Sequence, residues 1–303
     1  MGWPLNAANP PLQHAIVRPP RGRAVAQVLA AATLWAISGV VGRSLFRRSV
    51  DPAHLVQVRM LLGGLALIPL AFVRREARLP LRTLPGVAAY TLILTAVQLT
   101  YFEAIAAAGV AVAIFLQYTS PLIVAAWESA RSRRLPSRPI LISMSLAAAG
   151  SALLVLPGGG ARVPLRGLAW GIASAFAFAA TTIVGGGLRR RGVAATALLA
   201  TGLALGSLAF VPLRMPWQAL AAIAPSDWPY FLYVAIMATA VPFTLYASAL
   251  VSIRGSVATL LAMLEPVLAA ALAWVALGET LAPVQLLGGA LILAAIALAA
   301  RAG

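Results

Sequence analysis

A glutamate and a proline stand side by side within the apolar stretch TLLAMLEPVLAAALAWVALGETL, which runs from Thr259 to Leu281. A charge at the centre of a bilayer costs about 2.5–3.5 kcal/mol on insertion scales, so such residues face the protein interior. Glu265 lies about ten residues into a span, which at ~1.5 Å per residue is near mid-depth. We therefore expect a proton site, a contact for a substrate amine or a partner for an arginine. A structural acid that holds helices together is an equally weighted alternative.

A second charge, Arg59, lies inside the apolar run that begins at Pro52. Long arginine side chains reach toward water from the ends of a span, but Arg59 is too far in to do so without a cavity. It is a candidate for binding a substrate carboxylate. The interpretation that we favour is an ion pair with Glu265 or Glu103.

Two prolines, Pro121 and Pro266, are predicted to interrupt helices near mid-depth. Each lacks a backbone N–H and so frees a carbonyl of the preceding turn. Such breaks bend a helix and provide a hinge. The recurrence of the proline in both halves of the chain favours a gating hinge over a tolerated kink.

Aromatic and polar side chains on the inner spans are candidates to line a pocket for a small amphipathic solute. The alternative for each is packing in the core or in an interfacial aromatic belt. With Arg59, the predicted substrate-binding residues are Trp35, Ser38, Gln98, Tyr101, Gln117, Tyr118, Trp170, Phe178, Tyr233, Met237, Phe243 and Tyr246.

The elements that must position these residues are membrane-spanning helices. The 303-residue chain is 61% hydrophobic and 10% charged, whereas soluble domains carry about 25% charge. Its apolar runs approach the roughly 20 residues that a spanning helix needs. The ten predicted spans are Ala24–Gly42, Pro52–Val73, Leu84–Ala107, Val110–Ser129, Pro139–Leu156, Leu165–Gly187, Val193–Leu213, Trp228–Val251, Gly255–Leu277 and Leu281–Ala300.

The arginines predict the orientation of these spans. The net charge is +16 and the chain contains no lysine, so the arginines between the apolar runs act as topology signals. With the N-terminus in the cytoplasm, 16 arginines fall on the inner side and 6 on the outer side. We expect both termini in the cytoplasm, with residues 1–23 forming a disordered tail. The alanine-rich, lysine-free composition suggests a GC-rich bacterial genome and hence a multi-pass protein of the cell (inner) membrane.

The two halves of the chain resemble each other. At an offset of 145 residues, Tyr101 matches Tyr246 and Pro121 matches Pro266. At the same offset, Ser120 corresponds to Glu265. Earlier in each half the offset is 143 residues, and there Gly202 corresponds to Arg59. A repeat of five spans must enter the membrane from the opposite side the second time. The predicted fold is an all-α polytopic membrane protein with two inverted five-helix repeats around a central cavity, an architecture typical of alternating access.

LLAMLEPVLAAALAWVALGETL, ATLWAISGV, VQVRMLLGGL and QYTSPLIVAAW occur in an order that resembles the EamA-type permeases of the drug/metabolite transporter superfamily. The resemblance covers about residues 24–300. It implies repeats at 24–157 and 165–300, and a cavity lined by spans one to four and six to nine, with five and ten peripheral. It also implies export of small metabolites, amino acids among them.

Other classes of function have weaker support. A chain without lysine has neither a Walker loop nor a Schiff base, and it also lacks cysteine. The two histidines have no metal-site partner at helical spacing, so we expect no cofactor, no metal and no nucleic-acid partner. A channel or a membrane-embedded enzyme acting on a small metabolite are the alternatives to a carrier. The sequence leaves the oligomeric state open between monomer and homodimer, although GLAWG and GLALG allow close helix contact.

Overall fold

The computed structural model describes residues 19–155, 164–277 and 282–302, and within these ranges every regular element is helical. Most of the predicted N-terminal tail and the start of the tenth span at Leu281 lie outside the described residues. The longer helices are α1 (Arg21–Arg47), α2 (Pro52–Val73), α3 (Leu84–Ala108), α5 (Ser120–Ser132), α6 (Arg138–Val155), α7 (Leu165–Arg190), α8 (Ala195–Ser207), α13 (Leu264–Leu277) and α14 (Pro283–Ala302). The shorter ones are α4 (Val110–Gln117), α9 (Pro216–Ala221), α10 (Trp228–Ala235), α11 (Val241–Ala249) and α12 (Gly255–Ala262).

Eight helical stretches in the described part of the chain are long and apolar enough to cross a membrane. Two shorter apolar stretches, Arg138–Leu154 and Ala195–Phe210, coincide with the fifth and seventh predicted spans. The spanning helices therefore form where the apolar runs predicted them, while the count of ten crossings remains a prediction. The sequence did not predict α9, which lies in the segment that we read as a separator between two spans.

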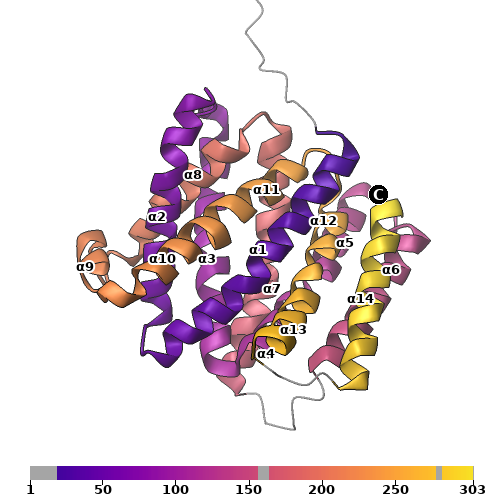
Figure 1. The fold of residues 1–303 in the computed structure, drawn as a ribbon. Coiled ribbons are helices and arrows are strands. Elements are labelled where there is room, and N and C mark those ends of the chain that lie inside the picture. The colour runs from indigo at the N-terminus through magenta and orange to yellow at the C-terminus, as the bar shows by residue number, and fades with distance from the viewer. Residues whose placement is uncertain (1–18, 156–163, 278–281, 303) are drawn as a thin grey trace, which may run out of the picture.

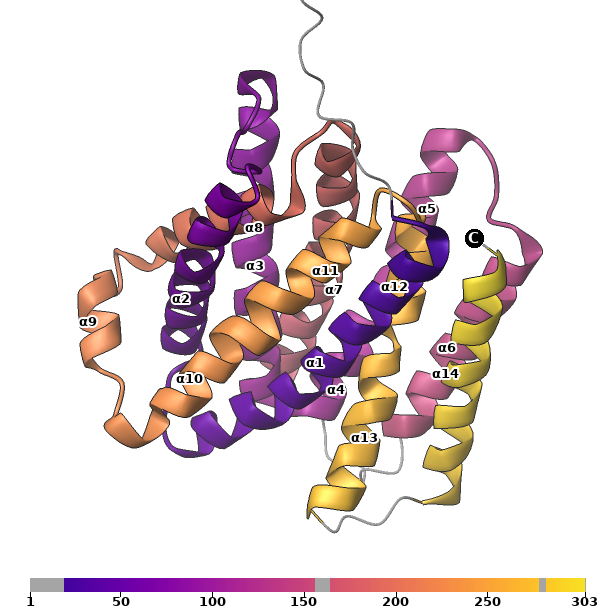
Figure 2. The ribbon, with the colours of Figure 1, turned by 45° about the horizontal axis from the view of Figure 1, so that its top comes forward.

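The helices pack mainly in pairs that join the two halves of the chain. α1 lies along α11, α3 along α7, α2 along α8 and α6 along α14. The α6–α14 pair forms one edge of the bundle and α2 with α9 the opposite edge, as both views show (Figures 1 and 2). Each half thus buries its apolar surface against the other, so neither half forms a core of its own.

Small residues set the closest helix contacts. A Cβ atom at Gly171 would lie 2.3 Å from the Leu116 side chain, and one at Gly206 would lie 2.4 Å from Met60. Such distances are too short for any side chain, so glycine is required for these approaches. The glycines of GLAWG and GLALG therefore serve packing within the chain.

Both termini of the described chain lie at the same face of the bundle. Arg21 Nη2 donates to the carbonyl of Ala300 over 2.5 Å, and Ser252 Oγ donates to the carbonyl of Pro19 over 2.7 Å. Figure 1 shows the chain entering beside the C-terminal end of α14. We call this the termini face, and the other end of the bundle, where α1 ends, the far face.

Two of the predicted spans are interrupted at corresponding positions. α4 ends at Gln117 and α5 begins at Ser120, while α12 ends at Ala262 and α13 begins at Leu264. Pro121 and Pro266 follow these interruptions within the first turns of α5 and α13. The helices break where the prolines predicted, because a proline cannot donate to the carbonyl four residues earlier.

A third irregularity lies between α10 and α11, where Ile236–Ala240 forms a π-helical turn. The matched prolines Pro85 and Pro229 are 144 residues apart, whereas the matched tyrosines Tyr101 and Tyr246 are 145 residues apart. The second half therefore carries one extra residue between these points. A π-helical turn accommodates such an insertion within a continuous helix, and it changes which side chains face the interior beyond it.

Candidate functional site

A central cavity lies where the helices of both halves meet. Its volume is about 30 Å³, which is room for about two water molecules. Its lining comprises Trp35, Ser38, Arg59, Val97, Gln98, Tyr101, Gln117, Phe178, Phe243 and Glu265. Seven helices contribute to it, namely α1, α2, α3, α4, α7, α11 and α13, and neither α6 nor α14 borders it among the described residues. All but Val97 were singled out in the sequence.

Glu265 is buried, with 4% of its surface exposed, and lies between two tyrosines. Tyr101 Oη donates to Glu265 Oε1 over 3.1 Å, and Tyr118 Oη lies 2.7 Å from Glu265 Oε2. Hydrogen bonds to a charged acceptor are about twice as strong as neutral ones. The tyrosines therefore supply the polar surroundings that a carboxylate needs among apolar helices.

The Tyr118 hydroxyl has a second acceptor at the interruption of the ninth predicted span. It lies 2.8 Å from the carbonyl oxygen of Ala262. Ala262 is four residues before Pro266, so its carbonyl has no helical donor. One hydroxyl of the first half thus lies between the free carbonyl and the carboxylate of the second half.

Arg59 is also buried, at 2% exposure, and does not form the ion pair that we favoured. Its Nε donates to Thr239 Oγ1 over 2.7 Å and its Nη2 to the carbonyl of Ala238 over 3.0 Å. Ala238 and Thr239 both belong to the π-helical turn, so Arg59 bonds this irregular part of the helix. The predicted partners are engaged elsewhere, because Glu265 bonds the tyrosines and Glu103 pairs with Arg166 over 2.9 Å.

The ring of Phe102 completes the surroundings of the guanidinium. The Arg59 Cζ atom lies 4.5 Å from the centroid of that ring. A guanidinium over an aromatic face is attracted by the quadrupole of the ring. The guanidinium is therefore held by a hydroxyl, a carbonyl and a ring, and Arg59 and Glu265 both border the cavity without pairing with each other.

An aromatic cluster forms the apolar side of the cavity. The Trp35 ring lies 5.0 Å from Phe243, 5.6 Å from Tyr246 and 6.0 Å from Phe178, measured between centroids. Tyr246 Oη is 2.8 Å from Thr182 Oγ1 and does not itself border the cavity. Tyr118 likewise lies behind the lining, although its hydroxyl reaches Glu265.

The other polar residues at the cavity differ in their partners. Gln117 Nε2 donates to Ser174 Oγ over 2.8 Å. In contrast, Gln98 Nε2 and Trp35 Nε1 are buried without a hydrogen-bond partner among the described residues. Since buried polar groups are nearly always paired, these two donors require an explanation.

Besides Tyr118 and Tyr246, three more of the predicted pocket residues do not border the cavity. Met237 is 41% exposed on the outside of the bundle, and Trp170 and Tyr233 are partly buried away from the lining. Met237 lies within the π-helical turn, whose extra residue rotates the helix relative to a regular 3.6-residue period. Met237 was a candidate because it lies on a predicted inner span, and this criterion does not say which side of the helix faces the cavity.

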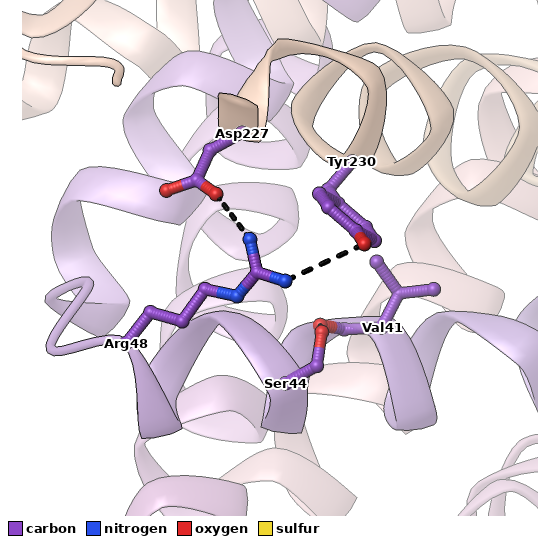
Figure 3. Close-up of polar contacts among 5 residues, drawn as sticks. All are labelled: Val41, Ser44, Arg48, Asp227 and Tyr230. Carbon is purple, nitrogen blue, oxygen red and sulfur yellow. Dashed lines mark hydrogen bonds and ion pairs between the residues drawn. The ribbon is translucent and has the colours of Figure 1, made fainter. Parts of the chain in front are cut away.

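The sequence did not reveal a polar clasp at the far face, which comprises Arg48, Asp227 and Tyr230. Arg48 Nη1 pairs with Asp227 Oδ1 over 2.6 Å, and its Nη2 lies 3.5 Å from Tyr230 Oη (Figure 3). The hydrogen bond to Asp227, followed by that to Tyr230, raises the pKa of Arg48, so the guanidinium stays charged. The clasp joins the end of α1 to the start of α10, and only the packing of the two halves brings these residues together.

A helical bundle with apolar outer surfaces and a polar cavity at its centre defines a multi-pass membrane protein. Models of known protein families identify the class further. The model of the EamA-like transporter family matches the chain twice, at residues 22–156 and 165–301. The chain belongs to the EamA-like transporter family.

Several relatives match over most of their length. The uncharacterized inner membrane transporter YicL of Salmonella typhimurium is 30% identical over 284 residues, covering 89% of this chain and 93% of that protein. The threonine/homoserine exporter RhtA of Escherichia coli is 29% identical over 276 residues, covering 86% and 88% respectively. A solved crystal structure aligns with a TM-score of 0.75 at 20% identity, covering 92% of this chain and 97% of the other. The last comparison concerns the fold alone.

Proposed function

We propose that the protein is a secondary transporter that exports small metabolites across the cell membrane by alternating access, with amino acids as its class of solute. The observation that carries the proposal is the central cavity, which places one buried cation and one buried anion at the junction of the two halves. A solute with an amino and a carboxylate group matches this pair of charges. The similarity to a threonine/homoserine exporter supports the same class. The aromatic cluster beside the charges suits amino acids with aromatic or other bulky side chains.

Alternating access requires two halves that can exchange their roles, and the packing supports this. α1 and α7 are the first helices of the two proposed repeats, and α11 corresponds to the later part of α3. If each helix is replaced by its counterpart in the other half, the α1–α11 pair becomes the α7–α3 pair. The α2–α8 and α6–α14 pairs stay the same. This is the relation expected of an inverted repeat.

The cavity supports a carrier over the alternative of a channel. A volume of about 30 Å³ is far below the roughly 300–1,000 Å³ of pockets that hold small molecules. A continuous pore would have to hold a chain of water, whereas a carrier passes through a closed state between its two open ones. The proposed cycle requires the helices around the cavity to separate on one face at a time.

A flux assay tests the proposal. The purified protein in liposomes loaded with labelled threonine, homoserine or phenylalanine should release the label faster when unlabelled solute is present outside, because carriers show saturable counterflow. Ionic currents would instead favour a channel. Flux equal to that of protein-free liposomes for every solute would refute the proposal.

Cysteine labelling tests the inverted repeat. The chain has no cysteine, so single cysteines at Arg47 and Arg190 report unambiguously. These residues end α1 and α7, the first helices of the two halves. We expect them to react from opposite sides of the membrane, with Arg190 on the side of both termini. Labelling of both from the same side would refute the inversion.

A further inference from the structure

Two buried donors without partners border the central cavity. Trp35 is 7% exposed and Gln98 is 3% exposed. The Trp35 Nε1–H and the Gln98 Nε2–H donors have no hydrogen-bond partner in the part of the chain that the structure describes. They belong to α1 and α3, so the side chains of two separate helices that border one cavity each have an unpaired donor.

Arg59 adds a third set of donors to the same cavity. A guanidinium has five N–H donors, and the contacts with Thr239 and Ala238 use the Nε and one of the Nη2 donors. Arg59 therefore has more N–H donors than the two acceptors that it contacts, Thr239 and Ala238. Its contacts with its own chain also fix the orientation of the guanidinium.

Such a group of donors with a positive charge is complementary to an anion. A carboxylate accepts about four hydrogen bonds and matches the planar fork of arginine in a bidentate manner. Glu265 borders the same cavity and adds a negative charge. That charge disfavours a multiply charged anion such as a phosphate, and it favours a monoanion that also carries an amino group.

We propose that Arg59, Gln98 and Trp35 form a subsite for the carboxylate of the solute, so that a free carboxylate is required for recognition. The inference rests on the proposed function in that it uses the same cavity. A water molecule would also satisfy single donors, but it would not make recognition depend on a carboxylate.

Matched pairs of acids and amides test the subsite by binding. The melting temperature of the purified full chain in detergent is measured with threonine and threonine amide, and with phenylalanine and phenylalanine amide. We expect the acid of at least one pair to raise the melting temperature, and its amide to have no effect at the same concentration. Equal shifts by acid and amide, or no shift by any of the four, would overturn the subsite.

Measurements of binding and of transport together distinguish failure of the carboxylate subsite from failure of the proposed carrier function. If acids bind selectively and no solute is transported, the carrier function fails and the subsite stands. If labelled amino acids are transported and the amide competes as well as the acid, the subsite fails and the carrier function stands.

Variants at Gln98 test whether the preference for the acid over the amide depends on the proposed subsite. Gln98→Met keeps the length of the side chain and removes the donor, so the affinity for the acid should fall about tenfold. Gln98→Glu places a carboxylate among the donors, so the amide should then bind more tightly than the acid. An unchanged preference for the acid in Gln98→Glu would overturn the assignment.

Ser151 offers a matched control. Its Oγ is likewise buried and without a partner among the described residues, and it borders a second, separate cavity that Met144 and Leu260 also line. Ser151→Ala therefore removes an unpartnered polar atom elsewhere in the bundle. Its affinity for the acid should stay within about twofold of the unaltered chain, since only cavity donors contribute to the subsite. A loss equal to that of Gln98→Met would show a general effect on the fold and overturn the assignment.

Discussion

The interruption between α4 and α5 and the one between α12 and α13 share a backbone and differ in their side chains. In each, a proline follows the break and frees the carbonyl four residues before it. The second break has Glu265 beside its proline, and the first has Ser120. Tyr118 of the first break reaches the Ala262 carbonyl of the second, whereas no side chain among the described residues donates to the corresponding carbonyl of Gln117.

This difference distinguishes the residues that shape the backbone, which recur in both halves, from the residues that form the polar contacts, which do not. A proline follows the break in each half, so the breaks recur with the repeat. The residue that corresponds to Tyr118 is Met263, which cannot donate a hydrogen bond. The polar contacts at the second break therefore have no counterpart at the first break among the described residues.

The largest effect should come from removing the charge of the second break. Glu265→Gln keeps the shape of the side chain and replaces the charged acceptor of the Tyr101 hydroxyl with a neutral one, which weakens that hydrogen bond by about half. We expect counterflow of amino acids in liposomes to slow at least about tenfold, since charged hydrogen bonds contribute about 1.5–3 kcal/mol.

The matched change in the first break is Ser120→Ala. Its Oγ is buried without a partner among the described residues, so its loss removes no hydrogen bond. Counterflow should stay within about twofold of the unaltered rate, because a donor without a partner contributes no net bond energy. Equal slowing by both variants would mean that the breaks are chemically equivalent and would contradict the comparison.

A smaller effect, on stability, should follow from Tyr118→Phe. The variant leaves the Ala262 carbonyl buried without a donor, which costs about 1–3 kcal/mol. The melting temperature of the purified protein should fall by roughly 2–4 °C for each kcal/mol. Met263→Leu at the corresponding position conserves volume and should change it less.

A double-mutant cycle with Pro266→Ala identifies the carbonyl as the cause. Alanine restores the N–H that the Ala262 carbonyl lacks, so the loss from Tyr118→Phe should be smaller in this background. The contact of Tyr118 with Glu265 is the same in both backgrounds. Strict additivity of the two changes would show that the carbonyl does not matter.

The smallest effect should come from the polar clasp at the far face. The Arg48 side chain is 45% exposed and the Asp227 side chain 11%, so water screens the arginine and Asp227→Ala leaves no buried charge unpaired. Asp227→Ala should leave the melting temperature unchanged and modestly increase the labelling of a Ser38→Cys probe from the side where α1 ends. Thr83, the residue that corresponds to Asp227, pairs with no arginine in the described structure, and Thr83→Ala should not affect the labelling. A fall in melting temperature as large as that of Tyr118→Phe would contradict this ranking.

Much of the site was predictable because its signals are local. An acid within an apolar run must face inward, which placed Glu265 at the cavity. The sequence also predicted both helix breaks from their prolines. Arg59 does border the cavity, but its predicted partners were wrong, because charge alone favoured an ion pair and the polar atoms of the π-helical turn at Ala238 and Thr239 gave no signal. The π-helical turn, which moved Met237 to the outside, gave a signal only as a one-residue change in the offset between the halves.

The sequence by itself determined where the apolar helices form, where two of the predicted spans break and that Glu265 and Arg59 are buried, because each depends on residues within one span. Only the tertiary structure decided that Tyr118 bonds the Ala262 carbonyl, that Arg59 bonds the π-helical turn and that Arg48 meets Asp227. These contacts join residues more than 140 positions apart. Their formation depends on how the helices of the two halves pack and rotate against each other, which the pattern of apolar residues along a single span does not specify.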